Sequence, residues 1–184
     1  MNGGAEYNSN MKILIFTEGT ILIFGNAKGV SREEAVKQSK IAVISDLFFR
    51  AESGSPHDFK GYVPNGKTVE KLFQWKKQGI TIFYLTSRRI KKEIKAIKSI
   101  LKRFNFPDSD NLYFRNPGED YKDVAQRLVP DIIIEDDCES IGGEKEMTYP
   151  HISGDLKKKI KSIVVKEFEG IDHLPDKIEE LINY

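Results

Sequence analysis

Three short polar clusters stand where apolar runs end, and each contains residue types that can bind phosphate or a metal ion. The clusters are Glu18-Gly19-Thr20, Thr86-Ser87-Arg88 and Asp136-Asp137. The apolar runs before them are residues 12–16, 80–85 and 132–134. Apolar runs that end in small polar residues are typical of strands buried on both faces of a parallel sheet. We therefore expect three strands that each deliver a polar loop.

The clusters differ in the chemistry that they could supply. The first offers the carboxylate of Glu18 and a glycine turn whose backbone amides can bind an anion. The second offers the hydroxyl of Thr86 at a strand end, followed by Ser87, which suits a phosphate oxygen. The third offers two adjacent carboxylates, and Mg²⁺ prefers oxygen ligands. Lys122, 14 residues before Asp136, could reach the same edge and neutralise phosphate charge.

Helices between the strands would align these clusters along one edge of a sheet. Apolar residues recur at helical spacing at about residues 65–79, 89–104 and 124–129, and a last strand and helix are predicted at 162–165 and 175–183. This alternation predicts an α/β fold, with a doubly wound, mostly parallel sheet in a three-layer arrangement. Ligands of such sheets bind at the carboxyl ends of the strands, so the three clusters should form one site.

Composition limits the class of protein. The chain of 184 residues, with 39% hydrophobic and 31% charged residues, suits one globular domain. Lys and Arg total 29 and Asp and Glu 28, and this balance gives no reason to expect a nucleic-acid or membrane partner. The single cysteine, Cys138, excludes an internal disulfide and fits a reducing compartment.

The start of the chain bears on its location. Residues 1–10 have neither a basic start nor an apolar core, so we interpret them as a disordered lead-in and not as a signal peptide. No apolar run approaches the roughly 20 residues of a membrane span. We therefore expect a single domain at residues 11–184 and a cytoplasmic location.

The order of these motifs resembles the haloacid dehalogenase-like (HAD) superfamily, most of whose members are Mg²⁺-dependent phosphatases. The resemblance covers roughly residues 11–143 and adds a role for each motif. The implied catalytic residues are Glu18 and Lys122, the phosphate-binding residues are Gly19, Thr20, Thr86, Ser87 and Lys122, and the Mg²⁺ ligands are Glu18, Asp136 and Asp137. It also implies a small cap or flap insert at about residues 25–62.

The first motif departs from the family pattern at its central position. In ungapped register the family's nucleophilic aspartate falls on Phe16, with Thr17 next to it. Phenylalanine can neither attack phosphorus nor bind Mg²⁺, so this position cannot form an aspartyl-phosphate intermediate. Glu18 is also one methylene longer than the aspartate that it replaces.

Two functions remain open. We favour a Mg²⁺-dependent hydrolase of a small phosphomonoester, in which a water replaces the aspartate and Glu18 is the general base. The alternative is a HAD-like protein without catalytic activity that binds a phosphorylated ligand or a protein partner. The lysine-rich helix at residues 89–104 could bind nucleic acid, but we favour a solvated outer face because acidic residues elsewhere balance its charge.

Overall fold

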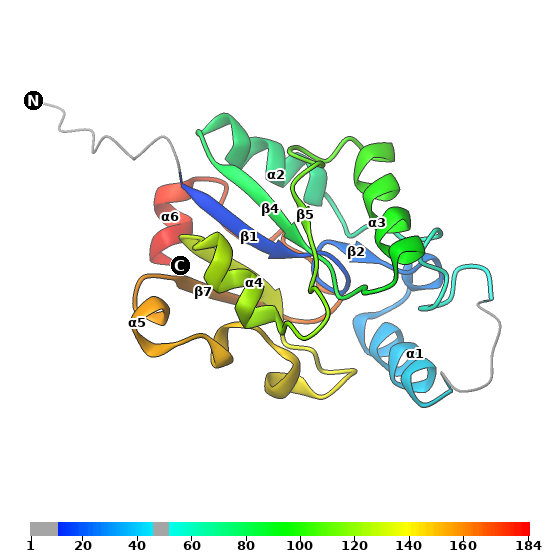
Figure 1. The fold of residues 1–184 in the computed structure, drawn as a ribbon. Helices are drawn as coiled ribbons and strands as arrows, with labels where there is room; N and C mark the ends of the chain where they lie inside the picture. The colour runs from blue at the N-terminus through cyan, green and yellow to red at the C-terminus, as the bar shows by residue number, and fades with distance from the viewer. Residues whose placement is uncertain (1–10, 46–51) are drawn as a thin grey trace, which may run out of the picture.

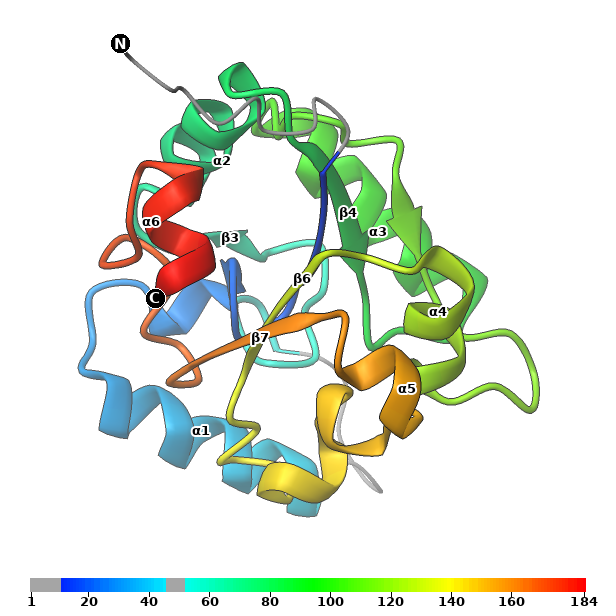
Figure 2. The same ribbon diagram turned by 90° about the vertical axis from the view of Figure 1, so that its left-hand side faces the viewer.

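A five-stranded parallel sheet with the strand order β5-β4-β1-β6-β7 forms the centre of the fold (Figure 1 and Figure 2). The computed structural model describes residues 11–45 and 52–184, and the predictions for residues 1–10 and 46–51 lie outside the described residues. The strands are β1 (Lys12–Phe16), β4 (Thr81–Leu85), β5 (Leu112–Tyr113), β6 (Ile132–Asp136) and β7 (Lys161–Val165). All neighbouring strands run parallel, so the predicted α/β class is confirmed.

Helices cover both faces of the sheet and complete the three layers. The helices are α2 (Thr68–Lys77), α3 (Lys91–Arg103) and α6 (Ile178–Asn183) in one apolar core, and α4 (Tyr121–Leu128) and α5 (Gly154–Lys157) in the other. Because side chains alternate along a strand, Ile13 and Ile15 of β1 enter the first core. Leu14 and Phe16 enter the second, which places Phe16 on the side of α4.

A second, small sheet brackets the interval that we predicted as a cap or flap. β2 (Leu22–Ile23) pairs antiparallel with β3 (Val63–Pro64), and a 3-10 turn (Gly25–Ala27) and α1 (Arg32–Ser45) lie between them. The break in the apolar run at Gly25-Asn26 predicts a turn or a short hairpin. The 3-10 turn is that turn, and the strand before it pairs with β3 and not in a local hairpin. The amide of Asn26 donates to the carbonyl of Gly54 at 2.8 Å, which joins this turn to the loop at residues 52–60.

The other predicted elements are confirmed with shifts at their ends. The helices predicted near residues 65–79, 89–104 and 124–129 are α2, α3 and α4, and the last strand and helix are β7 and α6. Ser31, Glu33 and Glu34 in the sequence predict the start of a helix that runs through Lys40, and α1 continues beyond that end. Within residues 11–45 and 52–184, no helix combines the length and the apolar character that crossing a bilayer requires.

Helical spacing in the sequence also predicts Phe73 and Ile90 on the apolar faces of their helices, but both residues are exposed. Phe73 is 40% exposed because Leu72 and Trp75, three residues apart, occupy the buried face of α2. Ile90 is 62% exposed because it precedes α3 in an extended conformation and so lies outside the apolar stripe. Neither change affects the sheet edge where the polar clusters lie.

Candidate functional site

The polar clusters meet at the carboxyl edge of the sheet, as their positions in the sequence predicted. β1 lies between β4 and β6, so the loops after these three strands are neighbours. β7 pairs with β6 on the far side and adds a fourth loop, which carries Glu167. The amide of Thr17 donates to the carbonyl of Leu85 at 3.0 Å, which fixes the first loop against the end of β4.

The turn after β1 packs directly on the acidic end of β6. The Thr20 hydroxyl donates to Oδ2 of Asp136 at 2.8 Å, and both residues are buried. Gly19 has a φ of +83°, and a Cβ there would lie 2.7 Å from the same oxygen. Only glycine fits this approach without a shift in the neighbouring carboxylate. The amide of Gly19 donates to the carbonyl of Leu22, and this contact closes the turn.

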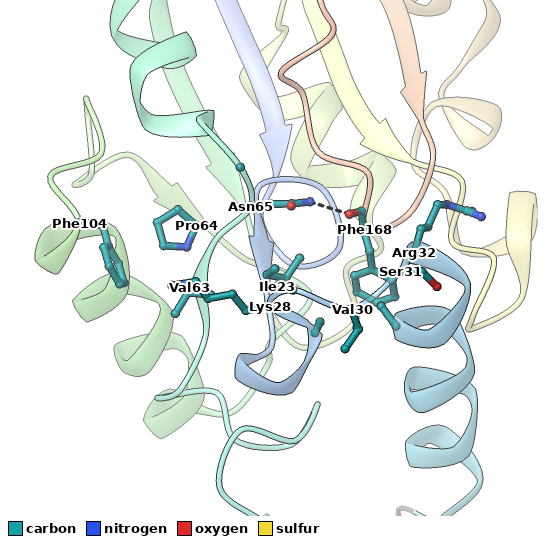
Figure 3. Close-up of a pocket in the computed structure, with 14 residues that line it drawn as sticks. Ile23, Lys28, Val30, Ser31, Arg32, Val63, Pro64, Asn65, Phe104 and Phe168 are labelled. Atoms are coloured by element: carbon teal, nitrogen blue, oxygen red, sulfur yellow. Dashed lines mark hydrogen bonds between the residues drawn. The ribbon is translucent and has the colours of Figure 1, made fainter.

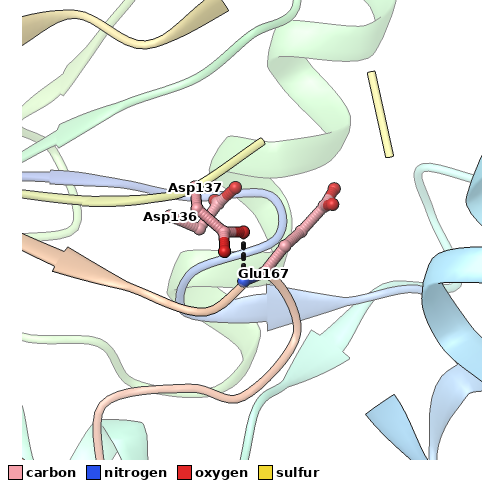
Figure 4. A group of neighbouring side chains, drawn as sticks. All are labelled: Asp136, Asp137 and Glu167. Atoms are coloured by element: carbon pink, nitrogen blue, oxygen red, sulfur yellow. Dashed lines mark hydrogen bonds between the residues drawn. The ribbon is translucent and has the colours of Figure 1, made fainter. Parts of the chain in front are cut away.

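Three acids form a group that could hold a metal ion: Asp136, Asp137 and Glu167 (Figure 4). One carboxylate oxygen from each lies within 4.8 Å of the others. Backbone amides hold all three, because Cys138 donates to Asp136 at 3.0 Å, Glu167 donates to Asp137 at 3.0 Å and Ser140 donates to Glu167 at 2.6 Å. The group is therefore fixed by the chain itself.

The charge of this group is only partly balanced. Burial and the nearby acids raise the pKa of Asp136 to about 6 and that of Glu167 to about 7. Burial also opposes the ionisation of Asp137, but the Glu167 amide and the ammonium of Lys166 at 3.1 Å outweigh it and lower its pKa. A buried set of oxygen donors with excess negative charge fits a hard cation such as Mg²⁺.

Glu18 lies among hydrogen-bond donors and is not part of the acidic group. Its carboxylate accepts from the Thr86 hydroxyl at 2.5 Å and from the Ser87 amide at 3.1 Å. The hydroxyl of Thr17 is 2.5 Å away, and Nε of Arg88 forms an ion pair at 3.4 Å. The donors that we predicted for a phosphate therefore surround the carboxylate of Glu18.

An aromatic pair fills the position that corresponds to the family's nucleophile. Phe16 is 8% exposed and meets Tyr121 edge-on, with ring centroids 5.0 Å apart. The guanidinium of Arg115 stacks on Tyr121 at 3.7 Å and donates to the Ser87 carbonyl at 3.3 Å. Lys122 follows Tyr121 and lines a separate cavity of about 200 Å³ with Arg115. Its predicted roles stay predictions, as no contact joins it to Glu18 or Asp136 within the described part of the chain.

A larger cavity of about 620 Å³ opens beside the acidic group (Figure 3). Phe168 lines it directly after Glu167, and its amide donates to the carbonyl of Gly19 at 2.8 Å. The lining is mostly apolar and comes from β2, β3, the start of α1 and the end of α3. Arg32, at the start of α1, reaches Asp137 at 3.8 Å. The cavity therefore joins the interval 25–62 to the sheet edge.

Two residues, Glu167 and Arg88, lie at the site although the sequence did not predict a role for them. Glu167 comes two residues after the predicted last strand, so the rule that placed Asp136 at the carboxyl edge could have found it. Arg88 belonged to a quoted motif but had no role, and the structure pairs it with Glu18. The sequence places no identifiable base near Cys138 and so favours a structural residue over a reactive thiol; Cys138 has a φ of +50°, and burial raises the pKa of its thiol.

Of three comparisons with known proteins, the one with solved structures gives matches, and these concern the fold. Neither a protein-family model nor a curated protein matches the chain. The class C acid phosphatase from Bacillus anthracis with tungstate bound is 13% identical, with a TM-score of 0.53 over 90% of this chain and 70% of that chain. A second structure of the class C acid phosphatase from Bacillus anthracis is 13% identical, with a TM-score of 0.51 over 98% of this chain and 79% of that one.

A third structure, a HAD family hydrolase from Deinococcus radiodurans R1 with bound phosphate and sodium, is 12% identical. The match covers 87% of this chain and 92% of that chain, with a TM-score of 0.40. At this level of identity, the two phosphatase structures establish the fold. The three-layer α/β fold of this chain is therefore similar to that of the two phosphatase structures.

Mg²⁺ should stabilise the protein in a manner that depends on pH. The raised pKa values of Asp136 and Glu167 mean that the folded chain holds protons that the unfolded chain has lost, so stability without metal should fall as pH rises from about 4 to 7. Mg²⁺ at 100 times its dissociation constant should restore about 2.7 kcal/mol at about pH 8, and much less at about pH 5. Thermal unfolding with and without Mg²⁺ measures both effects.

Asp136→Asn is the test variant and Asp155→Asn is its matched control, since Asp155 is fully exposed and, among the residues that the structure describes, pairs only with Lys158. The Mg²⁺ effect should disappear in the first variant and persist in the second. Equal stabilisation of both variants by Mg²⁺ would contradict a metal site at the acidic group.

Removing the carboxylate of Glu18 should create an anion site. In Glu18→Ala, the Thr86 hydroxyl, the Ser87 amide and Arg88 lose their internal anion and become free for an external one. We expect inorganic phosphate to bind about tenfold more tightly, which corresponds to roughly 1.4 kcal/mol. Calorimetric titration measures the change. Glu70→Ala, which removes an exposed acid from α2, is the control with the same net charge, and equal affinities in the two variants would refute the idea.

Proposed function

We propose that the protein is a Mg²⁺-dependent phosphomonoester hydrolase that works without an aspartyl-phosphate intermediate. One observation carries the proposal: a group of three carboxylates and a set of phosphate-type donors lie on either side of the same turn. Thr20 contacts the first set through Asp136, and Glu18 contacts the second through Thr86. A metal site beside an anion site is the arrangement that phosphoryl transfer requires.

The metal would be held by Asp136 and Asp137, as the resemblance implies, together with Glu167. Bound Mg²⁺ would polarise the phosphoryl group and lower the pKa of a coordinated water. Glu18 remains a predicted ligand, but its contacts with Thr86 and Ser87 support a role toward the phosphoryl group instead.

The phosphoryl group would take over the donors that now hold Glu18. These are the hydroxyl of Thr86, the amide of Ser87 and the guanidinium of Arg88, and Lys122 is the further cation that the resemblance implies. Gly19 and Thr20 shape the turn, since the amide of the first and the hydroxyl of the second already bond to Leu22 and Asp136.

Displacement of Glu18 would also give the reaction its base. Once a phosphate replaces it on Thr86 and Ser87, the free carboxylate stands beside the reacting phosphorus. It accepts a proton from the attacking water as the new P–O bond forms. It returns that proton to the ester oxygen as the old P–O bond breaks, so the products are an alcohol and inorganic phosphate.

The cavity of about 620 Å³ supports a substrate with an apolar organic part. Its volume is in the range of small-molecule sites, and Ile23, Val30 and Phe168 provide apolar surface. Lys28 and Arg32 could contact a polar end of the same molecule. Residues 25–62 would then act as the predicted small cap, because residues 27–32 and Ala35 form much of the wall.

A second candidate function is binding of a phosphorylated ligand without hydrolysis. Phe16 favours it, because a buried aromatic ring packed on Tyr121 stands where the family has its nucleophile. In this case the acidic group and the donors around Glu18 would serve recognition only. The same residues would bind the ligand, so turnover is what separates the two functions.

Phosphate release from a panel of phosphomonoesters tests the first function. We expect turnover that requires Mg²⁺, falls by about 100-fold or more in Asp136→Asn and stays unchanged in Asp155→Asn, because even the loss of a residue that only orients a metal ligand costs about 10- to 100-fold. Glu18→Ala should bind phosphate yet not turn substrate over. No turnover by the unaltered chain, with phosphate binding retained, would exclude the hydrolase and favour the second function.

Restoring an acid in Phe16→Asp tests what the aromatic residue has removed. If the chain is a lapsed enzyme, Mg²⁺-dependent turnover should appear only in this variant, because the carboxylate supplies the missing nucleophile. Phe16→Leu is the control, as it keeps an apolar residue in the same core. Circular dichroism and Mg²⁺ titration of both variants identify a loss of folding, and turnover equal to that of the unaltered chain would argue against Phe16 as the limiting change.

A further inference from the structure

The outer face of α3 borders a groove of about 610 Å³ that is lined by cations. Lys91, Lys92 and Lys95 come from the first half of the helix, Arg103 from its end and Lys60 from the loop before β3. The rest of the lining is small or apolar, and it contains no acidic residue. The groove therefore concentrates positive charge in a chain whose net charge is only +1.

The lysines of the groove differ from the other lysines of the same helix. Lys98 and Lys102 pair with Asp110 at 3.1 and 2.9 Å. In the described part of the chain, the ammonium groups that line the groove, those of Lys60, Lys91, Lys92 and Lys95, form neither an ion pair nor a hydrogen bond. Like charges that gather without compensation repel one another, and an anion in the groove would relieve this repulsion.

The residue types indicate the kind of anion. Lysine ammonium groups act as point charges that suit phosphate oxygens, whereas carboxylates are recognised best by the planar fork of arginine. The one arginine of the groove already donates to the Tyr62 carbonyl at 3.2 Å. Lys91 and Lys95 stand one turn apart, roughly 5–6 Å between neighbouring positions, so the ligand should carry charge at repeated intervals.

We propose that this groove binds the phosphate backbone of single-stranded nucleic acid. A concave, basic track that follows the backbone is the form that such binding takes. Lys60, which lines the groove, follows Phe59 in the chain, and the ring of Phe59 lies 4.4 Å from the guanidinium of Arg88. The proposal concerns binding alone and does not depend on the hydrolase. Sequence alone favoured a solvated face, since it could not separate the groove lysines from those paired with Asp110.

The salt dependence of binding to a fluorescent oligothymidine tests the proposal. With four lysines on phosphates, the slope of log K against log salt should be about −3, since each contact on a single strand contributes about −0.7. In Lys91→Gln/Lys95→Gln the slope should fall to about −1.5. Lys98→Gln/Lys102→Gln removes the same charge from the same helix outside the groove and should leave the slope unchanged. Glutamine keeps helix propensity, and melting curves check that both variants fold.

Three outcomes would overturn the proposal. The first is anisotropy that does not rise with protein at low salt. The second is equal weakening by the two double variants, which would indicate a general charge effect. The third is full displacement of the oligonucleotide by polyglutamate at equal charge, which would identify the groove as a site for an acidic protein segment.

Discussion

The site depends on one contact, the packing of the turn after β1 against the buried carboxylate of Asp136. The Thr20 hydroxyl donates to this carboxylate at 2.8 Å, and Gly19 leaves no room for a Cβ beside it. The contact joins residues 116 positions apart in sequence, on strands that are neighbours in the sheet. It also fixes the residue before it, so that Glu18 reaches the loop after β4. The turn after β1 therefore determines where the three acids lie relative to the donors around Glu18.

This arrangement costs free energy of folding, and the contacts within the chain offset that cost only in part. Burial of carboxylates is unfavourable unless they are hydrogen-bonded or paired with cations. Backbone amides satisfy Asp136 and Glu167, but of the three acids the cations Lys166 and Arg32 pair with Asp137, and Arg32 is shared with Glu139 at 2.6 Å. The pKa values of the first two therefore stay raised. A divalent cation would supply the missing charge without a change in the backbone, because the amides already hold the ligands in place.

The sequence predicted the parts of the site that follow from periodicity and strand ends. The apolar runs identified β1, β4 and β6, and alternation with helices placed Glu18, Thr86 and Asp136 at one edge. Contacts between distant segments could not be predicted, because periodicity reports which residues are buried and not which segments are neighbours. The pairing of β2 with β3 and the place of Glu167 beside β6 depend on such contacts. The contacts of Glu18 with Thr86 and Ser87 also join distant segments, and they require the length of the Glu18 side chain.

The departures at positions 16 and 18 have connected effects. A carboxylate at position 16, on the strand next to β6, would add a further negative charge near acids that burial already penalises. Phe16 avoids that charge and packs on Tyr121 instead. The extra methylene of Glu18 meanwhile lets its carboxylate satisfy Thr86 and Ser87, which would otherwise need an external anion. As a result, the donors around Glu18 are already satisfied when no ligand is bound, because they hold an internal anion. Any phosphate that binds there has to compete with Glu18, and this competition sets the affinity of the site.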